Sequence, residues 1–344
     1  MVNITRWKFG KRWVYSTTYD EVVTSTVDNG LAIHEQFGAP GHLTVVVGQM
    51  GEPRDVPNSG YDATYTHVSV AECKLAQRYG WSVSSHSMTH NKLPGSMAVP
   101  ENARIEVVDS AKLLEERLGT PVTTFIAPGN DHCLQYAWPL AEEAGYLSMF
   151  GVRDQLNYPD TDLMQLCRPV VYHKLDDYNR SYDPYRLVYR ARETGGWIVD
   201  YTHAVQDELV IPNRELTPAE LGNRLEAVTR VGGDEVWLAV PEEVVDYLIM
   251  ARATTVADEQ RSPTAITYRL AAPAIPERIQ WHTLTFTCTV PQEWQDVVVQ
   301  VTDAGEHEPV VVDRIDDTTI RYSHRVCDGQ RVTIEPKERS ILNN

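Results

Sequence analysis

The sequence predicts an α/β fold followed by a β-rich domain, and two observations support this. From residue 13 to about 253, short apolar runs alternate with amphipathic segments, which is typical of βα units around a parallel sheet. After about residue 254, apolar and polar residues alternate between turns such as DAGE and CDGQ, which indicates antiparallel strands. We therefore expect a (β/α) domain over 1–253 and a small antiparallel β-sandwich over 254–344.

Seven apolar runs in the first domain are predicted as strands: WVYSTT (13–18), LTVVVG (43–48), WSVSS (81–85), VTTFIA (122–127), YLSMFG (146–151), GWIVDYT (196–202) and EVWLAV (235–240). Helices are expected between them. One helix is expected in VSVAECKLAQRYG and ends at Gly80, and another in RIEVVDSAKLLEERLG ends at Gly119. A third helix begins at Thr217 and Pro218. The stretch RATTVADEQRSP is predicted to be the linker between the domains.

Composition excludes several classes of protein. The 31 basic and 48 acidic residues give a net charge of −17, which would repel nucleic acid, and no basic cluster offsets it. No apolar run is long enough to span a membrane, and no secretion signal opens the chain, so a cytoplasmic location is expected. Five cysteines at wide spacings favour a reduced compartment, although Cys288 and Cys327 could form one bridge.

Four predicted strands run directly into polar residues at their carboxyl ends, where parallel sheets bind ligands. The first strand leads into two acids, the third into two histidines four residues apart, the fourth into a turn, and the sixth into another histidine. These residues are Asp20, Glu21, His86, His90, Pro128, Gly129, Asn130, Asp131 and His203. Each feature alone is weak evidence for function, but together they predict one shared site.

The residue types at these strand ends suit metal-assisted attack of water on an acyl group. Two histidines at i and i+4 on a helical or near-helical turn point the same way, and with one carboxylate they make the open site of a zinc-type ion. The second carboxylate can take a proton from water, while backbone N–H groups of the turn stabilise the oxyanion. Either Glu21 or Asp20 could supply the ligand carboxylate.

The order TYDE, HSMTH, FIAPGND and DYTHAV resembles the motifs of the polysaccharide deacetylases, the NodB-type carbohydrate esterases of family 4, over roughly residues 13–253. The resemblance implies a distorted (β/α) barrel that hydrolyses N-acetyl, or related acyl, groups on an amino-sugar polysaccharide or oligosaccharide. It implies a divalent cofactor, with zinc expected and cobalt, nickel or manganese as alternatives. The implied roles are Asp20 as base, His203 as the group that protonates the leaving amine, Glu21, His86 and His90 as metal ligands, and Pro128, Gly129 and Asn130 as the oxyanion and substrate turn.

Two departures from the family pattern stand out. Glu21 occupies the place of an aspartate, and FIAPGND lacks the arginine with which many members hold the catalytic aspartate. Arg168 or Arg153 could take over that role. Asp154 and Asp176 are the candidates for the acid of the family's fourth motif.

A second hypothesis from a different class stays open. The first domain could be a catalytically degenerate barrel that binds a carbohydrate or a partner, with the β-sandwich as a binding module. The expected partner is a carbohydrate with an acylated amino sugar, and a homo-oligomer is compatible with the sequence.

Overall fold

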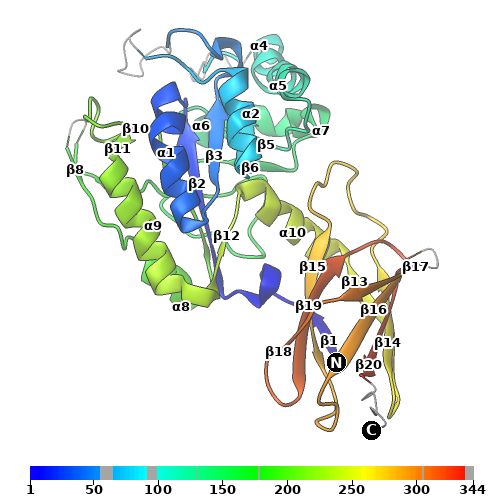
Figure 1. Ribbon diagram of the computed structural model, residues 1–344. Coiled ribbons are helices and arrows are strands. Elements are labelled where there is room, and N and C mark those ends of the chain that lie inside the picture. The colour runs from blue at the N-terminus through cyan, green and yellow to red at the C-terminus, as the bar shows by residue number, and fades with distance from the viewer. Residues whose placement is uncertain (55–64, 91–98, 130, 177–178, 304–305, 338–344) are drawn as a thin grey trace. The chain divides into compact units, whose positions relative to one another are not determined.

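The computed structural model describes residues 1–54, 65–90, 99–129, 131–176, 179–303 and 306–337 (Figure 1). The chain divides into two compact units: Trp13–Val245, and Met1–Arg12 together with Asp246–Asn344. The first twelve residues and residues 246–253 therefore lie in a different unit from the one that the sequence suggested. The first twelve residues belong to this unit because the short strand β1 (Val2–Ile4) pairs with β15 (Thr283–Thr289), near the other end of the chain. The periodicity of the sequence cannot show such a pairing.

Seven parallel strands form one curled sheet in the unit Trp13–Val245, as predicted for an α/β fold. The sheet runs in the order β12, β2, β3, β4, β5, β6, and β9 pairs with β2. The strands are β2 (Trp13–Asp20), β3 (Gly41–Val45), β4 (Ser82–Ser85), β5 (Thr124–Ile126), β6 (Ser148–Phe150), β9 (Trp197–Thr202) and β12 (Val236–Leu238). Each overlaps one of the seven predicted runs, with ends that differ by up to three residues.

The stretch between β6 and β9 contacts both of these strands. Leu166 bridges to Phe150 at the end of β6, and Val170 bridges to Tyr201 in β9. Arg168 lies between the two bridging residues, and its side chain is fully buried. The irregular stretch therefore carries an arginine toward the carboxyl ends of the strands.

Helices cover the sheet, and α1 and α9 pack side by side (Figure 1). The helices of this unit are α1 (Thr24–Phe37), α2 (Val70–Arg78), α4 (Pro100–Arg104), the π-helical turn η3 (Ile105–Asp109), α5 (Ser110–Leu118), α6 (Asp131–Ala137), α7 (Ala141–Ala144), α8 (Val188–Thr194) and α9 (Pro218–Gly232), with α10 (Pro241–Ala253) leading out of it. Thr217 caps α9 as predicted, in a reciprocal pair with Glu220.

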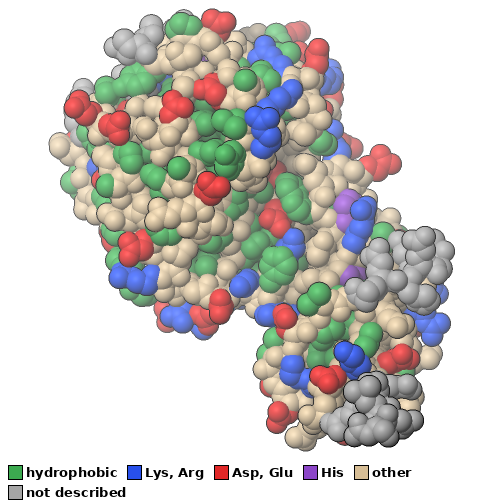
Figure 2. Space-filling model, in the orientation of Figure 1, with side chains coloured by type: hydrophobic (Ala, Val, Ile, Leu, Met, Phe, Trp, Pro, Cys, Tyr) green, Lys and Arg blue, Asp and Glu red, His purple; other side chains and the backbone are tan. Residues whose placement is uncertain are grey.

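Short elements complete the unit. They are the 3₁₀ turns η2 (Val47–Gln49), η4 (Trp138–Leu140) and η5 (Gly233–Glu235), the antiparallel pair β7 (His173–Lys174) and β8 (Arg180–Ser181), and the parallel pair β10 (Ala204–Val205) and β11 (Glu215–Leu216). All eight residues of β2 are buried, which is expected for a strand covered on both faces. On the face of this unit that Figure 2 shows, acidic and basic side chains are interspersed.

The other unit contains two antiparallel sheets. One has the order β1, β15, β19, β18, and the other has the order β13, β14, β20, β16, β17. Its elements are the turn η1 (Lys8–Gly10) and the strands β13 (Thr255–Arg261), β14 (Ile266–Ala271), β16 (Val297–Asp303), β17 (Glu306–Val310), β18 (Val312–Arg314), β19 (Thr319–Arg325) and β20 (Arg331–Pro336), besides β1 and β15. The sheets touch where the hydroxyls of Tyr268 and Tyr322 lie 2.8 Å apart.

The prediction that RATTVADEQRSP is a linker is wrong. Its first two residues end α10, and its middle forms strand β13, which pairs with β14. The pairing is interrupted by a bulge near Asp258, whose φ of 54° is left-handed. The charged, weakly periodic sequence of this strand reflects its position at the edge of the sheet, where several side chains face solvent.

Two expectations from composition can be compared with the structure. Cys73, Cys167, Cys288 and Cys327 are free thiols, so the bridge that the sequence left open between Cys288 and Cys327 is not formed. Among the described residues, no helix combines the length and apolar character needed to cross a membrane.

Candidate active site

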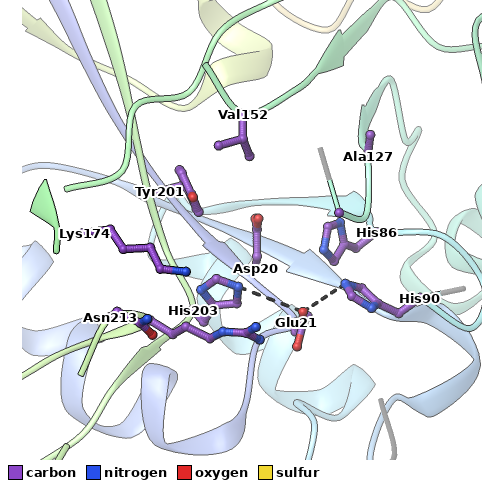
Figure 3. A pocket seen from close by; sticks show the side chains of 12 residues that line it. Asp20, Glu21, His86, His90, Ala127, Val152, Lys174, Tyr201, His203 and Asn213 are labelled. Atoms are coloured by element: carbon purple, nitrogen blue, oxygen red, sulfur yellow. Dashed lines mark ion pairs between the residues drawn. The ribbon is translucent and has the colours of Figure 1, made fainter. Parts of the chain in front are cut away.

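A cavity of about 340 Å³ opens at the carboxyl ends of the parallel strands (Figure 3). Six of the predicted site residues line it: Asp20, Glu21, His86, His90, Gly129 and His203. Pro128 is buried and is not among the lining residues, while Asn130 lies outside the described part of the chain. Segments that are more than 180 residues apart in the sequence therefore meet in one cavity.

The turn after β2 brings two consecutive acids to the same cavity. Consecutive side chains of an extended strand point to opposite faces, so Asp20 and Glu21 could not share a site if the strand simply continued. Glu21 has a left-handed φ of 50°, which breaks this alternation. Both carboxylates are buried and both line the cavity.

Asp20 is held by Arg168, one of the two arginines that the sequence left as candidates. The guanidinium donates two hydrogen bonds to the carboxylate, at 2.6 and 2.9 Å, and a third to the Thr18 hydroxyl at 3.0 Å. Burial acts to raise the pKa of Asp20, but the charge of Arg168 and the hydrogen bonds that it donates outweigh burial and hold this pKa well below its usual range. Asp20 is therefore ionised and fixed in one orientation.

Glu21, His86 and His90 form a buried triad whose ligand atoms all lie within 4.8 Å of one another. Oε1 of Glu21 lies 2.9 Å from Nε2 of His90, and the other carboxylate oxygen contacts Arg54. The geometry thus groups Glu21, rather than Asp20, with the histidines. The sequence analysis missed Arg54, which is buried and follows β3 by nine residues.

The two histidines do not lie on a helical turn, contrary to the expectation from their spacing. Residues 86–90 form a bend in which Ser87 and His90 have left-handed φ angles of 68° and 58°. The imidazole rings still meet, with centroids 4.7 Å apart. Nδ1 of His86 lies 2.8 Å from the Ile126 carbonyl, which can only accept, so Nδ1 donates and Nε2 keeps its lone pair.

The bend is anchored from two sides. Thr89, just before the second histidine, donates to Glu106 through both its N–H (2.9 Å) and its hydroxyl (2.5 Å). Glu106 is buried and belongs to η3, a π-helical turn of the kind often found at functional sites. On the other side, the N–H of Gly48 donates to the Met88 carbonyl at 2.8 Å, and a Cβ at Gly48 would lie only 2.7 Å from that oxygen.

His203 lies across the cavity from the histidine pair (Figure 3). Its Nε2 is 4.0 Å from Oε1 of Glu21, and its backbone N–H donates to the Arg214 carbonyl at 2.8 Å. Burial lowers the pKa of His203 to about 3, against the opposing charge of Asp20. Burial lowers the pKa of His86 to about 3 in the same way. Both imidazoles are therefore neutral near pH 7.

Several lining residues were not predicted as site residues. They are Ala127, Val152, Lys174, Tyr201, Asn213 and Arg214. Ala127, Val152 and Tyr201 lie at or near the ends of predicted strands, and Lys174 lies in the tyrosine- and aspartate-rich segment 173–186. Asn213 and Arg214 had no such signal in the sequence. The two candidates for the fourth-motif acid do not line the cavity: Asp154 pairs with Arg186, and Asp176 accepts from Asn179.

A triad of two imidazoles and a carboxylate lies beside an arginine-held aspartate and a further histidine on a curled parallel α/β sheet, and such groups can bind a metal ion and transfer protons. Residues 9–148 match the family model described as polysaccharide deacetylase. This part of the chain is therefore similar to polysaccharide deacetylases, as its motifs suggested. No curated protein matches the chain.

One solved structure supports the fold. A Mycobacterium smegmatis protein assigned as a polysaccharide deacetylase is similar, with 18% identity, a TM-score of 0.50, and coverage of 76% of this chain and 98% of the other. Weaker likenesses include a Bacillus cereus polysaccharide deacetylase (12% identity, TM-score 0.39, 66% and 91% covered). A Streptococcus pyogenes deacetylase in complex with acetate is another (19% identity, TM-score 0.36, 44% and 62% covered).

Proposed function

We propose that the unit Trp13–Val245 is a metal-dependent hydrolase that removes N-acetyl, or related acyl, groups from an amino-sugar polysaccharide or oligosaccharide. The family match supports carbohydrate deacetylation. The observation that carries the proposal is the meeting of the Glu21, His86 and His90 triad with Asp20 and His203 around one cavity. For stability alone, apolar side chains in these buried positions would serve as well as or better than charged ones.

The triad fits a divalent ion, with zinc expected. Two imidazole nitrogens and one carboxylate are the donors of a three-ligand catalytic site. The hydrogen bond from Nδ1 of His86 to Ile126 is the kind of support that metal-binding histidines have, and it leaves Nε2 to ligate. When bound, such an ion supplies charge that polarises the acyl carbonyl and lowers the pKa of water.

Asp20 is the proposed general base. It is ionised, it lines the cavity next to the triad, and its two hydrogen bonds to Arg168 aim it in one direction. In this proposal it takes a proton from the attacking water. Gly129, in its left-handed turn at the cavity, contributes the backbone N–H that faces the developing oxyanion.

His203 is the proposed donor to the leaving nitrogen. Because its pKa is depressed, it starts the reaction neutral and must acquire the proton that it delivers during turnover. Asp20 is the nearest proposed source, since the two groups act on each other's pKa. The proton taken from water would then end on the amine.

We also propose that the two antiparallel sheets of the other unit pack face to face as a β-sandwich. Three aromatic side chains support this. The Tyr268 and Tyr322 hydroxyls lie 2.8 Å apart, and the Phe286 ring lies 6.3 and 5.7 Å from the Tyr268 and Tyr322 rings. All three side chains are buried.

The experiment has two stages. Metal content is measured on protein purified without chelators, for wild type, His86→Ala and His90→Ala, with His282→Ala in the other unit as the control. Acetate release from acetylated chito-oligosaccharides is then measured with zinc, cobalt, nickel and manganese. We expect one divalent ion per chain in wild type and the control, and loss of metal and activity in both triad variants. Equal metal content in all four proteins would rule out the triad as the metal site.

A further inference from the structure

Tyr201 lines the cavity but has no part in the reaction proposed above. It belongs to β9 and precedes His203 by two residues, and side chains two apart on an extended strand share a face. Both side chains accordingly line the cavity, with ring centroids 6.1 Å apart. Figure 3 shows Tyr201 next to Asp20, on the side of Val152. The tyrosine therefore adjoins both the proposed base and the proposed proton donor.

The arginine that holds Asp20 also fixes the ring of Tyr201. The Arg168 guanidinium lies over this ring, 5.1 Å from its centroid, in a cation–π contact. The backbone N–H of Tyr201 donates to the Pro169 carbonyl at 3.1 Å, and its carbonyl accepts from the Val171 N–H at 3.3 Å. The main chain of Tyr201 is thus bonded to the residues on either side of Arg168, so the ring has one supported position.

The Tyr201 hydroxyl is available to a ligand as a donor. Tyr201 is half-buried, and its hydroxyl makes no hydrogen bond to another residue in the described part of the chain. Burial, and next the negative charge of Asp20, raise the pKa of Tyr201 to about 12, so the hydroxyl keeps its proton near pH 7. A donor that becomes shielded from water when substrate binds costs free energy unless the substrate supplies an acceptor.

The position of Tyr201 matches that of the acyl substituent in the proposed reaction. The attacked carbon bears an oxygen, the leaving nitrogen and the acyl substituent. The turn after β5 is proposed to face the oxygen, and His203 the nitrogen, to which the sugar is attached. The loop of Arg214 lies against His203 through a backbone hydrogen bond, so the sugar is expected on that side. The acyl substituent is then left to the lining formed by Ala127, Val152 and Tyr201.

We propose that Tyr201 selects the acyl group, by donating a hydrogen bond from its hydroxyl to an oxygen on the carbon next to the acyl carbonyl. The preferred substrate is then an amino sugar with a hydroxyacetyl (glycolyl) amide rather than an acetyl amide. The inference rests on the proposed function, because it names the acyl group of the same reaction. The same C–N bond breaks, and water supplies the oxygen of the released glycolic acid and the proton that goes to the amine.

The physical reason for this selection is the difference of one oxygen between the two acyl groups. The apolar side chains of Ala127 and Val152 accept either a methyl or a methylene group. A methyl group, however, leaves the Tyr201 hydroxyl shielded without an acceptor, and sites with a hydrogen-bonding group reject analogues that lack its partner.

Two sets of chito-oligosaccharides, one N-acetylated and one N-glycolylated, test the selection with the zinc-loaded full chain. The measured quantity is the ratio of kcat/KM for glycolate release to kcat/KM for acetate release. We expect a ratio of about tenfold or more in wild type. Tyr201→Phe, which keeps the ring over Arg168 but removes the hydroxyl, should bring the ratio close to one with unchanged metal content.

A matched variant assigns the effect to the cavity. Tyr189→Phe, at an exposed tyrosine of α8 that does not line the cavity, should keep the wild-type ratio. A ratio of one in wild type would overturn the selection and leave the deacylation proposal standing. A preference that persists in Tyr201→Phe would overturn it as well, because the tyrosine would then not be its source. Equal losses of both activities in Tyr201→Phe would also contradict it, since the hydroxyl would serve the reaction rather than the choice of acyl group.

Calorimetric titration separates this inference from the proposed function. If zinc-loaded wild type releases neither acid, the proposed reaction fails, and binding of the two amides decides the selection by itself. Binding of the glycolyl amide about tenfold more tightly by wild type, with this advantage lost in Tyr201→Phe, would support the selection. Equal affinity of wild type for the two amides would overturn it whatever the activity.

Discussion

The histidine wall of the cavity, formed by residues 86–90, and the basic wall, formed by Lys174, Asn213 and Arg214, are held in different ways. The histidine wall continues directly from β4. It accepts hydrogen bonds from η2 and donates hydrogen bonds to β5 and η3. The basic wall comes from the exposed pair β7 and β8 and from the loop before β11, and Asn213 connects them.

We infer from this difference that the histidine wall serves metal binding and the basic wall serves substrate recognition. A metal-binding group needs its ligands held within a few tenths of an ångström, which favours a bend supported on rigid elements. Residues that recognise a substrate substituent can lie on surface segments, where sequence changes are tolerated more easily. We therefore expect damage to the histidine wall to change metal binding, and damage to the basic wall to change substrate preference.

The largest effect is expected between the two walls, at Asp20. Asp20→Asn keeps the shape of the side chain and an acceptor for Arg168 but removes the proton acceptor. We expect kcat to fall by about 100- to 10,000-fold while metal content stays at the wild-type level. The measurements are steady-state acetate release and metal analysis on the same preparation. Activity within a few-fold of wild type would remove Asp20 from the role of base.

A smaller loss is expected from Arg168→Lys. Lysine keeps the positive charge but cannot donate the two parallel hydrogen bonds that orient Asp20. We expect kcat to fall by about 10- to 100-fold with unchanged metal affinity. Arg192→Lys, at an exposed ion pair with Glu235, is the matched control and should behave as wild type. If both variants are equally active, the orienting role of Arg168 is wrong.

Glu106→Ala tests the support of the histidine wall. Removing the carboxylate frees both donors of Thr89, so His90 loses its fixed position, and we expect metal affinity to fall about tenfold. The readout is competition with a chelator of known affinity. Glu115→Ala is the control, because Glu115 also accepts from a backbone N–H, that of Val122, but does so at the opposite end of the same helical segment.

The two glutamate variants separate a local from a general effect. Both should lower thermal stability, since each removes a hydrogen bond to a backbone N–H. Metal affinity should fall only in Glu106→Ala, and Glu106→Gln, which retains an acceptor, should recover part of it. Equal losses of affinity in Glu106→Ala and Glu115→Ala would reduce Glu106 to a purely structural residue.

The smallest effect is expected at Asn213. Asn213→Ala removes the hydrogen bond to Asp176 and loosens the connection within the basic wall, at a cost of about 1 kcal/mol. We expect KM for the substrate to rise several-fold while metal affinity is unchanged. Chelator competition and steady-state acetate release check this together. A loss of metal affinity would show that the two walls are coupled.

Much of this site could be predicted from the sequence because its main residues follow strands directly. Buried parallel strands are readable as apolar runs, and their carboxyl ends must lie at one edge, so Asp20, His86 and His203 could be assigned to one place. The support of His90 by Glu106 could not be foreseen, since a π-helical turn has no clear sequence signal. Neither could the bend at residues 86–90, whose left-handed φ angles at Ser87 and His90 depart from the helical geometry suggested by the spacing.

The sequence by itself determined the order of βα units, the family resemblance and the types of side chain delivered to the cavity, because these depend on local patterns of polarity. Tertiary structure alone decided which distant groups reach that cavity. Arg168 rather than Arg153 holds Asp20, Arg54 meets Glu21, and Lys174 and Arg214 share one wall. Long cationic side chains can contact partners far away in the sequence, and only the path of the intervening chain determines which carboxylate each one meets.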